Sequence, residues 1–448
     1  MSASANKGFV FKNPFQWLKD FLYKFQLLEI TATALTGVAG MLTVLFVNWQ
    51  LLRDGFIMLF YTSPLWILYL SRRVAWHYWI HMRRHEFIDG DRQKGAVYEI
   101  RIPKDVQKSP FAMEVVFNAL YIKPSLTTAF QRDWRGHVRP WWSFEIVSDG
   151  GELKFYIWCW KRFQFRIEAA MYAQYPGVQL VEVEDYAAQV KYIPGVNLVT
   201  GTNFVLKKPD TYPLKTYFDF DLHKDPKAEY RIDPFAAMIE SMCVTKPGEK
   251  LWLQILVQYS EDEKWKSRVK KAIDEIYNSR QVEVPSIANP DESTFMRLGL
   301  KPLQYEMVKS MERSTTKNHF DVGLRAVYSA PQDIFRRIPF DSIMHAFKYY
   351  SSSGPYYNAI GPFGESWLAN FDFPWEDFNN IRANRLRHRL LDAYTKRSIF
   401  HPPYKQITSI MTSEELATIF HIPGEDSKTL NLTRLESKRG NPPPNLPF

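Results

Sequence analysis

An uncharged apolar run near the N-terminus, Ile30–Leu52, limits most strongly what this chain can fold into. Its 23 residues include no Asp, Glu, Lys or Arg. A helix of that length is about 34 Å long, enough to cross a hydrocarbon core of about 30 Å. A second uncharged run, Gly55–Leu70, follows after only Arg53-Asp54 and is interrupted by Pro64. The two runs predict a transmembrane helical hairpin over residues 27–71.

Positive charges flank this hairpin on both sides: lysines precede the first run and arginines follow the second. Because such flanks stay on the cytoplasmic side, the sequence predicts a two-helix protein of the cytoplasmic membrane with both termini in the cytoplasm. A cleaved signal peptide fits poorly, since the first run is too long and a second follows at once; a buried core helix is the other alternative. The residues expected at the membrane interface are Arg72, Arg73, Trp76, Trp79, Arg83 and Arg84.

A basic, aromatic connector, residues 72–94, follows the second run. His77, His81 and His85 recur there every four residues, so a helix would align them on one face, where three histidines could bind a metal ion. The alternative is an interfacial helix with its Trp, Tyr, Arg and His side chains at the level of the lipid headgroups. The sequence favours that alternative, because only Glu86 is at hand to complete a metal site.

The length, the cysteine count and the net charge limit the number of domains and the kinds of metal, disulfide and binding sites to expect. The length of 448 residues indicates two or three domains. Cys159 and Cys243 are the only cysteines and belong to no ligand pattern, so we expect neither a disulfide framework nor a zinc site, and no cofactor. The net charge of +9 is compatible with nucleic acid, an anionic surface or an acidic partner and does not choose among them.

From residue 95 onward, segments with the two-residue alternation of strands and segments with helical spacing follow one another, which indicates an α+β domain. The first part reads as a strand, a helix that begins with Ser109-Pro110, a hairpin around Asp149-Gly150-Gly151, a helix and a final strand. The corresponding ranges are 97–103, 109–122, 139–160, 162–176 and 178–186. This β-α-β-β-α-β order predicts a ferredoxin-like module over residues 95–190.

A similar order recurs over residues 205–400 as a second, enlarged module. We expect strands over 214–222, 250–260 and 319–330 and within 356–363, and helices over 233–245 and 331–351, with Pro339 as a potential break. Helices over 264–277 and 302–313 form a charged insertion, and a basic helix covers 381–397. A cytoplasmic tail, 1–26, precedes the hairpin. Residues 401–448 hold a short helix over 412–421, with Thr412 or Ser413 as its cap, and a Pro-rich tail.

Motifs of common enzymes are missing. The sequence contains no GxxxxGK[ST], GxGxxG, GxSxG or HExxH, so no catalytic activity is predicted. "DFDLHKD", residues 219–225, would place Asp219 and Asp221 on one face of a strand with His223, as in a metal nuclease, but solvated acids at a strand end explain it better. Glu182 and Glu184 have the same two interpretations.

The basic helix over 381–397 is the candidate contact for nucleic acid or an acidic partner. Arg382, Arg385 and Arg389 are three and four residues apart and share a helical face, and Arg387 lies near it. A solvated amphipathic face is the simpler interpretation.

Four stretches carry a family resemblance: 108–121, 138–157, 172–186 and "SEELATIFHIPG…TRLESKRGNPPPNLP" in 413–447. In this order they resemble the N-terminal, non-ATPase region of the type IV secretory system conjugative DNA transfer proteins. The resemblance covers most of residues 95–190 and 290–448. In that family the Pro-rich stretch leads into a hexameric P-loop motor domain, which is not found in this sequence.

The resemblance therefore implies a membrane-anchored, non-catalytic subunit that docks a separately encoded P-loop ATPase. The lipid bilayer, DNA at the basic surface and further copies of the chain are the other partners considered. Two alternatives stay open: an oligomerising scaffold of an envelope or pilus assembly, and a membrane-tethered nuclease that uses residues 219–225.

Overall fold

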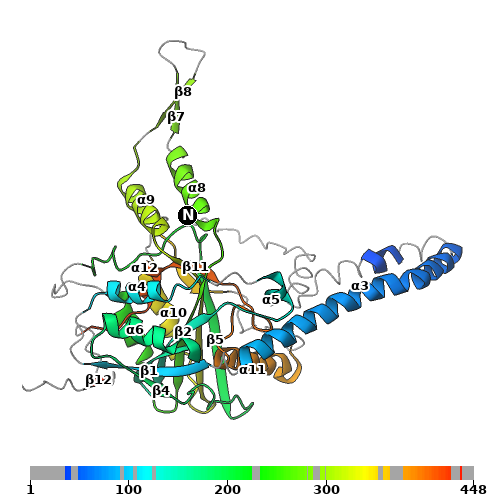
Figure 1. Cartoon of the computed structure of the whole chain (residues 1–448), viewed down its shortest axis with the longest axis horizontal. Helices are drawn as coiled ribbons and strands as arrows, with labels where there is room; N and C mark the ends of the chain where they lie inside the picture. Colours follow the sequence, from blue (N-terminus) through cyan, green and yellow to red (C-terminus); the bar gives the residue numbers. More distant parts are fainter. Residues whose placement is uncertain are drawn as a thin grey trace, which may run out of the picture. The chain divides into compact units, whose positions relative to one another are not determined.

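The computed structural model forms two compact units, Met1–Arg83 and Arg84–Phe448 (Figure 1). The residues that it describes are 36–41, 49–90, 95–103, 108–123, 128–223, 233–279, 281–285, 293–297, 299–351, 357–363, 377–424 and 434–435.

The N-terminal helix corrects the predicted membrane topology. Arg53-Asp54, expected as the turn of a hairpin, lies inside one continuous helix, α3, Trp49–Asp89, which also runs through Pro64. In the described part of the chain, no helix is both long and apolar enough to cross a bilayer. The uncharged run Gly55–Leu70 is 16 residues, or about 24 Å of helix, short of a core of about 30 Å.

The predicted location, a two-helix protein of the cytoplasmic membrane, is therefore wrong by this structure. Much of the first predicted span, residues 30–35 and 42–48, lies outside the described residues. The predicted tail 1–26 lies outside them too.

The first half of the second unit follows the predicted element order. The elements are β1 (Gly95–Pro103), α4 (Pro110–Ala119), β2 (Trp141–Asp149), β3 (Glu152–Trp160), α6 (Gln164–Gln174) and β4 (Gln179–Val183), with the short helices α5 (Ala129–Asp133) and η2 (Lys161–Phe163) between them. The β2–β3 hairpin turns at Gly150 and Gly151, whose φ values of +60° and +95° favour glycine. The strands pair in the order β2-β3-β1-β4.

The second half repeats this order with one correction. Its elements are β5 (Asn197–Leu206), α7 (Pro234–Met242), β6 (Lys250–Tyr259), β9 (His319–Pro331), α10 (Ile338–Ala346), η3 (Phe347–Tyr350) and β10 (Ile360–Pro362), and its strands pair as β10-β5-β9-β6. The strand predicted over 214–222 is wrong: this segment forms turns, and β5 takes its place. The helix predicted over 331–351 begins only at Ile338, because β9 runs to Pro331 and turns follow it, and Pro339 stands in the first turn of α10.

The two halves join edge to edge into one sheet. β2 pairs with β6 in antiparallel register from Trp141–Gln258 to Asp149–Lys250. The ten strands lie in the order β10-β5-β9-β6-β2-β3-β1-β12, with β11 (Ser409–Thr412) on β9 and β4 on β1. Among the strands of the described residues, β12 (Arg434–Leu435) alone pairs in parallel. The predicted α+β class is confirmed.

Helices cover both faces of this sheet. α4, α6, α7, α10 and α12 (Ser413–Ile419) share one hydrophobic core with the sheet, around Phe117, Phe235 and Phe420. The opposite face is covered by α11 (Ile381–Thr395), which η4 (Phe378–Asn380) precedes. There Leu390 and Tyr394 pack with Trp252 of the sheet.

The charged insertion forms an arm. α8 (Trp265–Asn278) and α9 (Pro302–Thr315), both predicted, pack along each other around Val269 and Met311. They lead to a two-stranded hairpin of β7 (Gln281–Pro285) and β8 (Ser293–Arg297) (Figure 1).

Candidate functional site

A row of buried polar side chains crosses the sheet beneath α11. Asn203, Arg325, Gln254 and Glu145 lie directly opposite one another on β5, β9, β6 and β2. They form a chain of hydrogen bonds. Arg325 donates to Asn203 (3.1 Å) and to Gln254 (3.3 Å), which donates to Glu145 (3.0 Å). We name these four residues the polar row; it crosses the β2–β6 junction and so fixes the register of the two halves.

Arg397 closes the row from the end of α11. It donates from Nε to Glu145 Oε1 at 3.0 Å and from Nη2 to Asp185 Oδ1 at 2.9 Å. Both Arg397 and Glu145 are at most 1% exposed. Burial alone would lower the pKa of Arg397, but Glu145 and Asp185 raise it well above its ordinary value. With Arg325, the site has two guanidinium groups and two carboxylates, so its formal charges balance.

The backbone at Arg397 is strained. Its φ of +47° lies in the left-handed region that usually belongs to a glycine after a helix. For a residue with a Cβ this conformation costs about 1–2 kcal/mol. The ion pairs with Glu145 and Asp185 offset that cost.

Two glycines let α11 approach the sheet closely. A Cβ at Gly201 would lie 2.7 Å from Leu390 Cδ2, and one at Gly323 would lie 2.5 Å from Ile399 Cδ1. Both distances are shorter than van der Waals contact, so larger residues would push away α11 and the segment after it. The polar row and these glycines together fix which face of α11 points outward.

The arginines predicted as a contact surface separate into two groups. Arg382, Arg385 and Arg389 are exposed, and the Arg389 guanidinium donates to the Pro403 carbonyl at 2.6 Å. Arg387 is half-buried and donates to the Tyr192 hydroxyl at 3.4 Å, so it belongs to the inner side of the helix. We name Arg382, Arg385 and Arg389 the arginine face.

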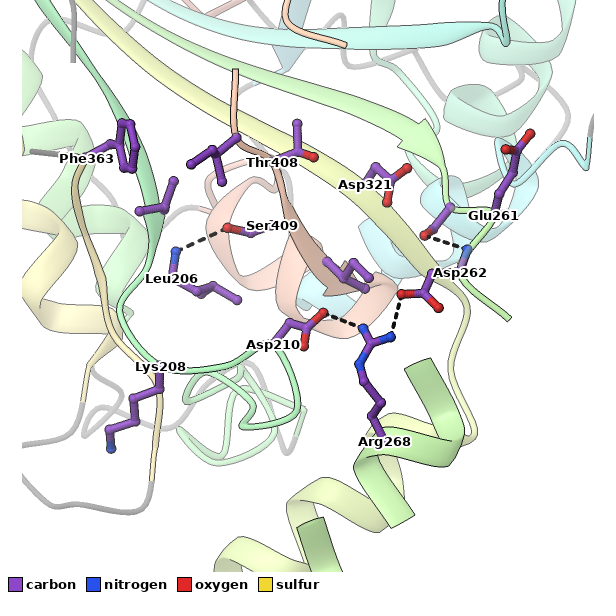
Figure 2. Close-up of a pocket in the computed structure, with 14 residues that line it drawn as sticks. Leu206, Lys208, Asp210, Glu261, Asp262, Arg268, Asp321, Phe363, Thr408 and Ser409 are labelled. Atoms are coloured by element: carbon purple, nitrogen blue, oxygen red, sulfur yellow. Dashed lines mark hydrogen bonds and ion pairs between the residues drawn. The ribbon is translucent and has the colours of Figure 1, made fainter. Parts of the chain in front are cut away.

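A polar cavity of about 550 Å³ lies at the base of the arm, where the chain passes from β6 into α8. Figure 2 shows Arg268 of α8 between Asp210 and Asp262, with ion pairs of 2.9 and 2.6 Å. Glu261 and Asp321 add two carboxylates to the lining. Burial raises the pKa of Asp321. The pair with Asp210 ties the base of the arm to the body, and no local sequence pattern indicates it, because the two partners are 58 positions apart.

A C-terminal segment, Met411–Pro423, is buried at every residue. We name it the clasp. It contains α12, whose cap Thr412 forms a capping box with Glu415. Burying so many polar groups is tolerated only where each finds a partner.

The polar side chains of the clasp bond to different parts of the second unit. Two contacts reach the helices α4 and α9: Ser413 donates to Glu114 of α4, and Arg313 of α9 donates to Glu414. Two backbone amides, those of Leu214 and Tyr217, donate to the side chains of Glu415 and Thr418. His421 forms a hydrogen bond with Asp233 at the start of α7. Lys317, just after α9, also donates to Glu114 at 2.7 Å. The clasp therefore holds α4, α7 and the base of the arm together.

Glu415 should make stability depend on pH. Burial raises its pKa from 4.5 to about 7, although hydrogen bonds from Thr412 and Leu214 oppose the shift. The folded state then binds the proton more tightly than the unfolded state. The contribution of Glu415 to stability is therefore fully present below pH 4.5 and is lost as pH rises through 7, by about 3 kcal/mol in all.

Denaturant unfolding of the wild type and Glu415→Gln at pH 4.5 and 7.5 checks this expectation. The difference in unfolding free energy between the two proteins should change by about that amount across the range. Glu312→Gln, on an exposed position of α9, should leave the pH dependence unchanged. A pH-independent difference for Glu415→Gln would contradict it.

The described residues 219–223 do not form the acid cluster that the nuclease alternative requires. Asp219 accepts from Thr216 and pairs with Arg313 at 3.0 Å. Asp221 lies in a turn with φ +58°, and His223 stacks on Phe218. Because the segment is not a strand, the alternation that would align the two acids is absent, and residues 224 and 225 lie outside the described range.

The other predicted positions have ordinary surroundings. Glu182 pairs with Lys161 at 3.1 Å, and Cys159 is buried while Cys243 is partly buried. The predicted membrane-interface residues Arg72, Arg73, Trp76, Trp79, Arg83 and Arg84 lie along α3. Their role depended on membrane spans that the structure does not bear out.

One family comparison covers most of the chain. No curated protein matches the chain. Residues 85–434 match the sequence model of a family described as a domain of unknown function, DUF8128. The match begins near the end of α3 and reaches β12, so it takes in the whole sheet, the arm, α11 and the clasp. The chain therefore belongs to the DUF8128 family.

Proposed function

We propose that this chain is a non-catalytic subunit of a DNA-transfer machine of the conjugative type, and that it docks a P-loop ATPase. The proposal starts from the resemblance of four sequence stretches to the non-ATPase region of conjugative DNA transfer proteins. The most extensive of these, residues 413–447, begins inside the clasp and ends in the Pro-rich tail.

The clasp is the observation that carries the proposal. In the resembling family, the stretch that follows this motif leads into the motor. Here the part of the motif that lies in the clasp, residues 413–423, is buried and bonded to α4, to Asp233 at the start of α7, and to Arg313 of α9. A partner that binds the tail would therefore act on the whole second unit and not on a loose end.

We also infer that each half of the sheet is a ferredoxin-like module. The pairing orders β4-β1-β3-β2 and β10-β5-β9-β6 are those expected for two β-α-β-β-α-β units. Joined through β2 and β6, they would form a rigid platform for the clasp on one face and α11 on the other.

The arginine face supplies the second contact in this proposal. Three exposed arginines on one helical face suit the phosphate backbone of DNA, which gives salt-dependent binding with little sequence preference. The polar row and the glycines beneath α11 hold that face outward.

Affinity purification of the tagged chain from its own cells tests the function. A P-loop ATPase should be retained by the wild type and lost when Pro442, Pro443 and Pro444 are replaced by Ser, because the proposal makes the Pro-rich tail the docking element. The matched control, Arg382→Glu with Arg385→Glu and Arg389→Glu, should keep the ATPase but bind duplex DNA at least tenfold more weakly. Failure of the wild type to retain any P-loop ATPase would overturn the docking role and leave the oligomerising scaffold as the better interpretation.

A further inference from the structure

Two histidines of α3 meet at bonding distance. His77 Nε2 and His81 Nε2 are 2.9 Å apart, and their rings pack edge to face with centroids 4.2 Å apart. His77 is exposed and His81 is half-buried. Two imidazole nitrogens bound to one tetrahedral Zn²⁺ lie about 3.3 Å apart, so a shift of a few tenths of an ångström would convert this contact into two metal bonds.

One chain supplies too few ligands for a closed site. In the described ranges, no group of three or more His, Cys, Asp and Glu side chains could hold a metal ion. A structural zinc site has four ligands. A second His77–His81 pair from another copy of the chain would complete it.

The same face of α3 carries exposed apolar side chains at a regular spacing. Phe56, Phe60, Ile67 and Val74 are 55%, 75%, 51% and 42% exposed. With Ser63 and Leu70 between them, they recur at alternating intervals of four and three residues. This is the heptad spacing at which two helices interlock, and its next two positions are His77 and His81. We name these eight positions the histidine seam.

Neighbouring positive charges are engaged with their own helix. The Arg73 guanidinium lies 5.9 Å from the Tyr69 ring centroid, and that of Arg83 lies 4.6 Å from Trp79. Neither arginine occupies a position of the histidine seam.

We propose that two copies of the chain pair in parallel along the histidine seam, and that His77 and His81 of both copies bind one Zn²⁺ ion. Parallel, in-register pairing brings both histidine pairs to the same level and also pairs positions 56–74 of the two seams, which an antiparallel pairing centred on the histidines would leave unpaired. The inference is independent of the proposed function and departs from the sequence expectation of no metal.

The full chain, stripped with EDTA, tests the proposal by its mass and metal content. Addition of Zn²⁺ should double the mass in light scattering from 52.7 kDa and leave one zinc per two chains. Co²⁺ in its place should show the visible absorption of a tetrahedral site. A mass that does not respond to zinc, or one zinc per chain, would overturn the proposal.

Variants separate the metal ligands from the seam. His77→Ala and His81→Ala should each weaken zinc binding at least tenfold and abolish the cobalt spectrum, whereas His85→Ala should preserve both. Phe60→Glu, which keeps both histidines, should prevent the doubling of mass. Equal losses in His85→Ala and His77→Ala would contradict the assignment.

Discussion

Replacing Arg397 with methionine should lower the free energy of unfolding by about 3–5 kcal/mol, because it leaves the buried Glu145 carboxylate without its charged partner. Glu145 is fully buried, and its other hydrogen-bond donors are the neutral groups of Ser143, Tyr186 and Gln254. The loss should appear as a lower denaturant midpoint with an unchanged slope.

A double-mutant cycle shows whether the charge or the packing is responsible. Arg397→Met combined with Glu145→Met should recover a large part of the loss, since an apolar pair can replace a buried ion pair at little cost. Arg382→Met, on the exposed side of α11, should change stability by less than about 0.5 kcal/mol. If the loss of unfolding free energy in the double variant equalled or exceeded the sum of the losses in the two single variants, the unpaired carboxylate would not be the source of the loss.

Periodicity predicted most of the fold because most elements have one apolar face. It identified α4, the β2–β3 hairpin, α6, α8, α9 and α11, and it placed the last strand of the second half correctly. It missed β5, "NLVTGTNFVL", for a physical reason. Gly201 is small so that Leu390 can approach, and Asn203 is polar because it belongs to the polar row, so the alternation that marks a strand is lost.

The strand predicted over 214–222 in place of β5 was wrong because its apolar and polar residues alternate although the segment is not a strand. Residues 214–222 alternate between apolar and polar types, but Asp219 accepts bonds from the Thr216 backbone and hydroxyl, which stabilises turns instead. At the N-terminus, the absence of charge over Gly55–Leu70 suggested a membrane helix, but the run is too short and continues into charged turns of the same helix.

The site could be predicted only in part. The spacing of the arginine face was visible because helical neighbours are close in sequence. Arg397 and Glu145 are 252 positions apart, so no local pattern links them, and an arginine with positive φ has no sequence signature. The clasp was noticed through its resemblance to another family, but its burial and its partners follow only from the tertiary structure.

Replacing Phe420 with alanine should lower the free energy of unfolding by about 3–5 kcal/mol, as much as the loss of the Arg397–Glu145 ion pair. Phe420 is fully buried in the clasp, and its ring centroid lies 5.2 Å from that of Phe144 and 6.2 Å from that of Phe235. Its removal would leave a cavity between the sheet, α7 and the clasp. Denaturant unfolding measures the loss.

The matched control is Phe165→Ala on α6, where the ring is 80% exposed and the same change should cost less than about 0.5 kcal/mol. Phe420→Leu keeps most of the apolar volume and should cost less than about 1.5 kcal/mol. Limited proteolysis should then cut Phe420→Ala within the clasp, but not Phe420→Leu, because only the larger loss lets the segment open. Similar losses for Phe420→Ala and Phe165→Ala would mean that the clasp is not part of the core, and the docking role that depends on its rigid attachment would lose its structural basis.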